Sequence, residues 1–185
     1  MNNQLYVITG GPGSGKTTLI EALAAAGYAT APEAGRAIII DQAAIGRPDI
    51  GTHDPALFAE LMLSWDMRSY RWALQQPGPV FFDHAVAGMP AYFRLTGLPV
   101  PSHVAAAAEA FRYARQAFIA PPWREIYRTD EERHQTFDEA VRTFEAAAVG
   151  YREQGYELLE LPKCDVSGRL AFVLGHLSLP VPAPC

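Results

Sequence analysis

The chain has 185 residues, of which 49 % are hydrophobic and 19 % are charged, a size and composition that fit one globular domain and exclude extended disorder. Its 20 acidic side chains outnumber 15 lysines and arginines and leave a net charge of −5, which argues against nucleic-acid binding because that relies on neutralising phosphates. No apolar run is long enough to cross a membrane and residues 1–4 lack the features of a secretory signal, so we expect a soluble, cytoplasmic protein that does not bind membranes.

Short apolar segments alternate with amphipathic ones along the chain, which predicts an α/β fold. The first half is expected to form a strand at 5–9, a helix from about 16 that Gly27 ends, a strand at 28–31, a helix through 38–40, a loop at 46–55 and a long helix over 55–76. The second half is expected to form a strand at 80–83, helices at 89–97 and 102–114, a strand at 116–120, a charged segment, a helix from about 137 that Gly155 ends, a strand at 156–161 and a helix over 166–177. We therefore predict one domain over residues 1–179, followed by a proline-rich tail at 180–185.

The strongest motif is a phosphate loop, because the stretch GGPGSGKT fits the pattern G-x-x-x-x-G-K-[ST] and lies between an apolar strand and an amphipathic helix. Its glycines let the backbone curl around a phosphate with the N–H groups pointing inward, and the positive end of the following helix adds to the attraction. Lys16 is expected to reach the β- and γ-phosphates, while Thr17 offers its hydroxyl to Mg²⁺. The predicted nucleotide-binding residues are Gly10, Gly11, Pro12, Gly13, Ser14, Gly15, Lys16, Thr17 and Thr18.

Two acidic residues follow apolar strands whose carboxyl ends should lie beside the phosphate loop. Asp83 ends the strand 80–83 and is the candidate metal-organising carboxylate together with Thr17, the alternative being a turn or cap residue. Glu33 follows the second strand and could accept a proton from a substrate hydroxyl or hold the metal through water, the alternative being a residue that stabilises a helix N-terminus. Arg36, one turn further on, could meet a substrate anion or simply pair with a carboxylate.

The charged segment at about 121–134 predicts a lid over the phosphate site. It carries Arg124, Arg128 and Arg133, and phosphoryl transfer commonly needs an arginine to stabilise charge in the transition state. Arg133 is the first candidate because it lies where the segment enters a helix. The alternative is a solvated charged loop, since acidic residues in the same segment balance the arginines.

The peptide Pro162-Lys163-Cys164-Asp165 has the lysine and aspartate spacing of the guanine-reading motif N-K-x-D, but proline replaces the asparagine. A polar turn in which Asp165 caps the last helix is the favoured interpretation. We therefore expect ATP as the nucleotide, its adenine held by backbone and apolar contacts in this loop.

A histidine and three aromatic residues are explained more simply by packing than by chemistry. His84 could touch a substrate, but a neutral structural histidine is the favoured interpretation. Phe58, Trp65 and Trp72 recur at helical spacing and are expected in the core rather than at a base-stacking site.

The chain resembles the P-loop ATPase/kinase family, with an AAA-type ATP-binding domain, that includes the ribosylnicotinamide kinase domain of the bacterial NAD-biosynthesis regulator. The stretches that carry this resemblance are ITGGPGSGKTTLIEAL, PEAGRAII, VFFDHAVAGMPAYF and APPWREIYRTDEERHQTFDEA with YREQGYELLELP. The resemblance implies a nucleoside- or nucleotide-kinase-like fold, three-layered α/β/α, with a five-stranded parallel sheet in the order 2-3-1-4-5 and a lid. It also implies that Asp83 is the metal carboxylate.

One departure separates the chain from these relatives, which commonly show an Asp-Arg-Gly-x-x-Asp run after the third strand. Here the run is Asp-His-Ala-Val-Ala-Gly, so the arginine and the second acid are missing. The expected function is a Mg²⁺-ATP-dependent kinase acting on a hydroxyl of a small, nucleoside-like molecule, with Lys16, Asp83, Glu33 and Arg133 as catalytic residues. An ATP- or GTP-hydrolysing switch and a nucleotide-binding interaction protein stay open as alternatives, as do the phosphate acceptor and the oligomeric state.

Overall fold

The computed structural model describes residues 4–127 and 136–180, which form a five-stranded parallel sheet in the order β2-β3-β1-β4-β5. The expected α/β/α fold and strand order are thereby confirmed. The strands are β1 (Leu5–Gly10), β2 (Ala29–Ala31), β3 (Val80–Asp83), β4 (Gln116–Ala120) and β5 (Glu157–Glu160). Each pairs in parallel with its neighbour, so all carboxyl ends lie along one edge.

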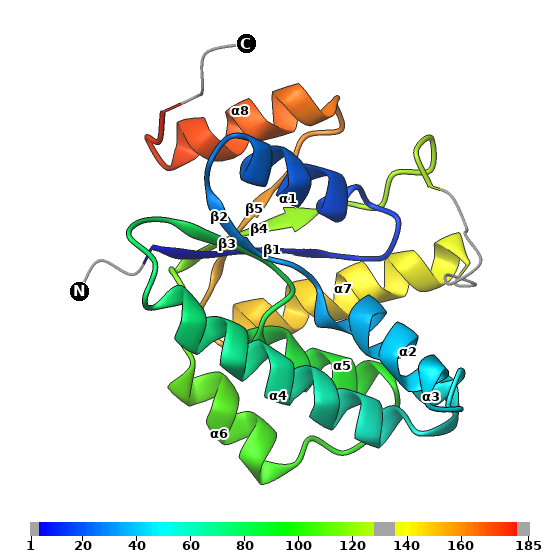
Figure 1. Cartoon of the computed structure of the whole chain (residues 1–185). Coiled ribbons are helices and arrows are strands. Elements are labelled where there is room, and N and C mark those ends of the chain that lie inside the picture. Colours follow the sequence, from blue (N-terminus) through cyan, green and yellow to red (C-terminus); the bar gives the residue numbers. More distant parts are fainter. Residues whose placement is uncertain (1–3, 128–135, 181–185) are drawn as a thin grey trace.

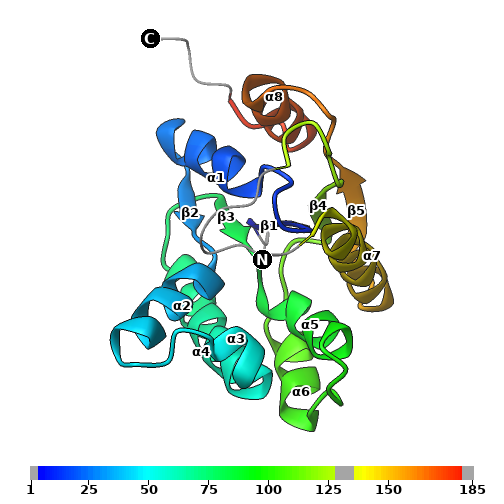
Figure 2. The ribbon, with the colours of Figure 1, turned by 90° about the vertical axis from the view of Figure 1, so that its right-hand side faces the viewer.

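Helices cover both faces of the sheet, as Figures 1 and 2 show. The face above the sheet in Figure 1 carries α1 (Lys16–Ala25) and α8 (Val166–His176). The opposite side carries α2 (Ala34–Ala44), α3 (Ile50–His53), α4 (Pro55–Ala73), α5 (Met89–Leu95), α6 (Ser102–Ala110) and α7 (Phe137–Glu153), with the 3₁₀ turn η1 (Val86–Gly88) leading into α5. No helix in the described part of the chain is both long and apolar enough to cross a bilayer.

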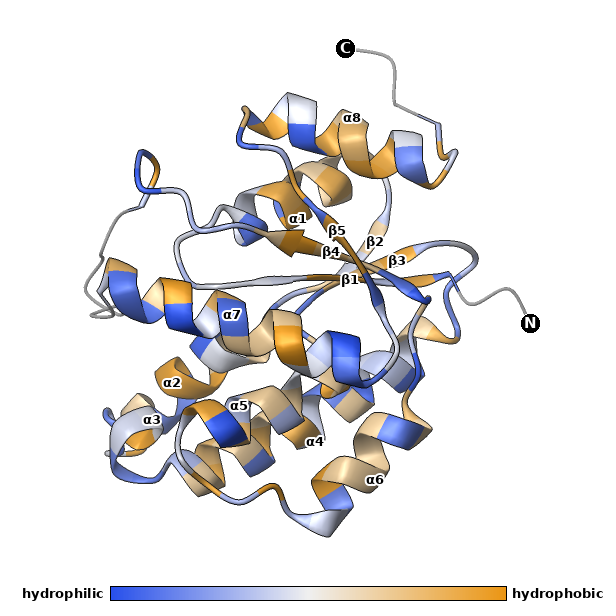
Figure 3. Ribbon diagram, turned by 180° about the vertical axis from the view of Figure 1, so that it is seen from behind, coloured by the Kyte–Doolittle hydropathy of each residue, from blue (hydrophilic) through white to orange (hydrophobic). Residues whose placement is uncertain are grey.

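The core lies in two layers because strand side chains alternate between the two faces of the sheet. Phe81 and Phe118 pack with α1 and α8, whereas the neighbouring Phe82 and Ala117 join the larger cluster under α4 to α7. In Figure 3 the strands carry mostly apolar residues, as expected for a sheet covered on both faces.

Three expectations on the elements were wrong in detail. Residues 46–55 are not all loop, because Ile50 is buried and starts the short helix α3. The helix expected to reach residue 114 ends at Ala110, and Ala114 N–H then donates a hydrogen bond to the carbonyl of Leu5 at the start of β1. Trp72, expected in the core, is 41 % exposed and lies in the last turn of α4.

Candidate functional site

The phosphate loop connects β1 to α1 in the predicted place, with its side chains turned onto its own backbone. The Ser14 hydroxyl donates a hydrogen bond to the Gly11 carbonyl at 2.7 Å, and Lys16 Nζ donates to the same oxygen at 2.9 Å. Gly15, just before the helix, has φ of 83°, a conformation that glycine adopts without strain. Thr18 lies in the first turn of α1 with an exposed side chain.

The Thr17 hydroxyl donates a hydrogen bond to Asp83 Oδ2 at 3.2 Å and joins the loop to the end of β3. Asp83 is 2 % exposed, and its Oδ1 has no hydrogen-bond partner among the described residues. Burial raises the pKa of Asp83 to about 6; Lys16 lowers the pKa and the Glu33 carboxylate raises it, so both lie near enough to act on it. A carboxylate oxygen without a partner, beside a hydroxyl and a phosphate loop, fits the preference of Mg²⁺ for hard oxygen ligands.

The described residues contain no group of three or more histidine, cysteine or acidic side chains placed to hold a metal. Such a closed cage is not required for magnesium, which is commonly held by one or two carboxylates together with substrate phosphates. The pair Asp83 and Thr17 therefore suits a metal that arrives with a nucleotide.

Glu33 and Arg36 come from the start of α2 and face the same space as Asp83. Glu33 occupies the N-cap position of α2, but its side chain makes no capping hydrogen bond. A carboxylate at this position still interacts favourably with the helix dipole, so both interpretations of Glu33 stay open. Both side chains are exposed and line a cavity next to the phosphate loop.

His84, directly after β3, is held by an acid that the sequence analysis did not single out. Its Nδ1 lies 2.9 Å from Oδ2 of Asp66 on α4, and Asp66 is 4 % exposed. Burial lowers the pKa of the imidazole, but the charge and hydrogen bond of Asp66, together with the nearby carboxylates of Glu33 and Asp83, raise it above the usual value. The ring is thus fixed by an ion pair to α4, and His84 also lines the cavity next to the phosphate loop. The sequence signal for Asp66 was its position on the apolar face of α4, four residues after Met62.

The cavity beside the phosphate loop has a volume of about 590 Å³ and extends away from Lys16 between α2, α4, α5 and α7. Its charged lining includes Lys16, Glu33, Arg36, Asp83 and His84. Its apolar lining includes Phe58, Met62, Tyr92 and Tyr151. This mixture of an apolar wall and converging polar groups is typical of a small-molecule site.

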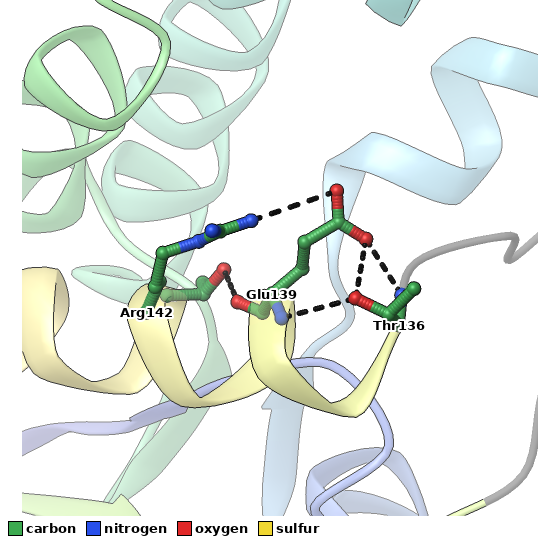
Figure 4. A network of polar contacts seen from close by, with 4 residues as sticks. Thr136, Glu139 and Arg142 are labelled. Atoms are coloured by element: carbon green, nitrogen blue, oxygen red, sulfur yellow. Dashed lines mark hydrogen bonds and ion pairs between the residues drawn. The ribbon is translucent and has the colours of Figure 1, made fainter.

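Helix α7 forms one wall of the cavity, and its start is fixed by a capping box (Figure 4). The Thr136 hydroxyl accepts a hydrogen bond from the Glu139 N–H at 3.3 Å, and the Thr136 N–H donates back to the Glu139 carboxylate at 2.6 Å. The hydrogen bond from the Thr136 backbone lowers the pKa of Glu139, so this carboxylate stays charged at the rim of the cavity.

The predicted lid is described only up to residue 127. Arg124 lies over the ring of Phe137 with its guanidinium carbon 4.2 Å from the ring centre, and Tyr127 packs on Gly13 of the phosphate loop. Arg128 and Arg133, the predicted transition-state arginine, lie outside the described residues.

Beyond the phosphate loop, the turn after β5 has the structure that the sequence favoured. Asp165 is the N-cap of α8, and its carboxylate accepts a hydrogen bond from the Gly168 N–H at 2.8 Å. Arg169, one turn further on, was missed; it is 3 % exposed and donates to the Ser14 carbonyl at 2.6 Å. In the sequence, Arg169 is marked as a charged residue within the apolar stripe of α8, between Val166 and Val173.

A family model described as an AAA domain matches residues 5–169, and the chain belongs to this family. Among solved structures, a NadR protein in complex with NR matches with a TM-score of 0.76 and 17 % identity, over 100 % of this chain and 53 % of that one. This chain thus spans about half of the NadR chain.

Two kinases match over nearly their whole length. Deoxyadenosine kinase from M. mycoides has a TM-score of 0.65 and 11 % identity, with 94 % of this chain and 98 % of that one covered. Thymidylate kinase from Ehrlichia chaffeensis has a TM-score of 0.63 and 15 % identity, with 97 % and 100 % covered. At these identities the likeness establishes the P-loop kinase-like fold, and the comparison with curated proteins found no match.

Proposed function

We propose that the protein is a Mg²⁺-ATP-dependent phosphotransferase that moves the γ-phosphoryl group to a hydroxyl of a small, nucleoside-like molecule. The observation that carries this proposal is the cavity of about 590 Å³, which is continuous with Lys16 and Asp83 and has an apolar wall at Phe58 and Tyr92. A protein that only hydrolyses ATP needs room for water beside the γ-phosphate, whereas this cavity has the size of a small-molecule site. The similarity of the fold to nucleoside and thymidylate kinases supports the same class of reaction.

In this proposal each site residue has a role in transferring one phosphoryl group. The acceptor oxygen forms a bond to Pγ as the bond from Pγ to the departing ADP oxygen breaks, and the acceptor proton passes to the Glu33 carboxylate. Lys16 and an arginine from the predicted lid, with Arg133 as the first candidate, neutralise charge on the phosphoryl oxygens. Thr17 and Asp83 would hold Mg²⁺, which neutralises phosphate charge when bound.

A second function, ATP hydrolysis without an acceptor, is favoured by one observation. Where relatives have an arginine after the strand-end aspartate, this chain has His84, whose Nδ1 is already engaged by Asp66. A switch or regulator would need the phosphate loop and Asp83, but not an acceptor-binding residue at this position.

An ATP-consumption assay separates these functions. We expect ADP release from ATP and Mg²⁺ to depend on an added acceptor from a panel of nucleosides, with a phosphorylated product detected by mass spectrometry. Lys16→Ala should abolish the release, because Lys16 contacts the transferring phosphoryl group. Equal ADP release with and without the panel would favour the hydrolase, and ATP binding without any release would favour a binding protein.

A further inference from the structure

Arg169 is a buried charge outside the acceptor cavity, and it contacts three separate loops. Its Nη1 donates to the carbonyl of Ser14 in the phosphate loop at 2.6 Å, and its Nε donates to the carbonyl of Pro162 after β5 at 2.9 Å. Its guanidinium carbon lies 5.1 Å from the ring centre of Trp123, in the segment after β4. Burying a charge is costly unless its hydrogen bonds are made, so a guanidinium this enclosed calls for an explanation.

The contact with Ser14 acts on a peptide group that a phosphate would meet. The Ser14 carbonyl and the Gly15 N–H belong to the same peptide, and in a trans peptide these two groups point in opposite directions. Because Arg169 holds the carbonyl, the N–H of the same peptide is fixed in the opposite direction, away from the guanidinium. Gly15 has no side chain to limit rotation of this peptide, so the backbone there needs an external hold.

The approach of Arg169 to the loop is close. A Cβ added at Gly15 would lie 3.0 Å from Nη1 of Arg169, tighter than an ordinary contact. The Nη2 atom is buried and has no hydrogen-bond partner among the described residues. The other two nitrogens, Nη1 and Nε, each donate to a loop carbonyl, so moving the guanidinium would break both hydrogen bonds.

We propose that Arg169 is a nucleotide-positioning residue, which holds the Ser14–Gly15 peptide in the orientation that binds a nucleoside di- or triphosphate and ties the loops after β4 and β5 to it. The inference rests on the proposed nucleotide-binding function but not on the identity of the acceptor. Because the backbone N–H groups of a phosphate loop cradle the α- and β-phosphates, the residue should matter equally for ADP and ATP.

Calorimetric titration of ADP and of ATP against Arg169→Met and Arg169→Lys tests this role. The methionine keeps the aliphatic stem but removes both donated hydrogen bonds, so we expect both dissociation constants to rise by about tenfold. Lysine keeps the charge and can reach only one carbonyl, so it should recover part of the affinity. If the methionine variant does not fold, the intermediate affinity of the lysine variant carries the same test.

Val173→Ala is the matched control. Val173 is fully buried on the same helix, and its side chain has no group that could hydrogen-bond to the loop carbonyls. It should lower the melting temperature and leave the affinities for ADP and ATP unchanged below that temperature. Wild-type affinity in Arg169→Met and Arg169→Lys would overturn the proposal, as would an equal loss of affinity in Val173→Ala. If the wild-type protein bound neither ADP nor ATP, the proposed function itself would fail, and the positioning role with it.

Discussion

Asp83 combines two properties that are rarely found in one carboxyl group, because it is almost fully buried and yet faces the cavity. An acid at the end of a strand was expected at the ligand-facing edge, and the extent of its burial was not expected. Burial disfavours the charged form, so this side chain destabilises the protein without ligand at neutral pH. Such a cost is reasonable at a functional site, where a cation and phosphates offset it.

Asp83→Asn should therefore separate stability from chemistry. The pKa of Asp83 is raised from 3.8 to about 6 on folding, so its favourable contribution is complete below pH 4 and is lost as the pH rises through about 6. Asparagine carries no charge, so the variant without nucleotide should melt at a higher temperature than the wild type above pH 7. Turnover should fall by roughly 10²-fold or more, about 2.7 kcal/mol of transition-state stabilisation.

Melting curves across pH and turnover, measured on the same preparation, check both halves of this prediction. ADP binding without Mg²⁺ should change little, since the backbone of the loop and Lys16 are expected to make most of the contacts to the phosphates. A variant that melts earlier than the wild type at pH 8 yet keeps its rate would remove Asp83 from the mechanism.

At the scale of the elements, the phosphate loop depends on α7, which follows it by more than a hundred residues. A Cβ at Gly11 would collide with the carbonyl of Ala140 in the first turns of α7, so the loop and this helix pack backbone against backbone. The same helix lines the cavity proposed for the acceptor and is anchored by the capping box at Thr136. The position of α7 thus links the phosphate loop to this cavity.

Gly11→Ala should disturb this contact. We expect the free energy of unfolding to fall by about 1–3 kcal/mol, because the added methyl group forces α7 away from the loop. We also expect ATP to bind more weakly. Gly175→Ala on α8 is the control: nothing lies near its added methyl group, and alanine should stabilise the helix by roughly 0.5–1 kcal/mol without changing ATP affinity. Urea unfolding and ATP titration measure both effects, and a neutral Gly11→Ala would show that the packing is looser than the distances indicate.

Local patterns were sufficient to predict most elements but not their long-range contacts. The strand 80–83 and the strand 116–120 were predicted with their observed bounds, because each is apolar and is bounded by turn residues. Asp66 and His84 are 18 residues apart, and Ser14 and Arg169 are 155 apart, so no local pattern connects either pair. Only the packing of α4 and α8 on opposite faces of the sheet brings these partners together.

The molecule as a whole divides its sheet edge into two regions around the phosphate loop. On one side, the ends of β2 and β3 with α2, α4, α5 and α7 enclose the cavity proposed for the acceptor. On the other side, the segments after β4 and β5 meet at Arg169, next to the loop. In the proposed function, acceptor selection and base selection would therefore fall to different elements.

This division leads to a prediction about the nucleotide base. Reading guanine with an aspartate requires a free carboxylate, but the carboxylate of Asp165 accepts the hydrogen bond that caps α8, and Pro162 stands where that motif has asparagine. We therefore expect ATP to bind more tightly than GTP in a competition titration. Asp165→Ala should lower the free energy of unfolding by about 1 kcal/mol through loss of the cap and leave the ratio of ATP to GTP affinity unchanged. Tighter binding of GTP, with a preference that Asp165→Ala abolishes, would instead make Lys163 and Asp165 readers of guanine.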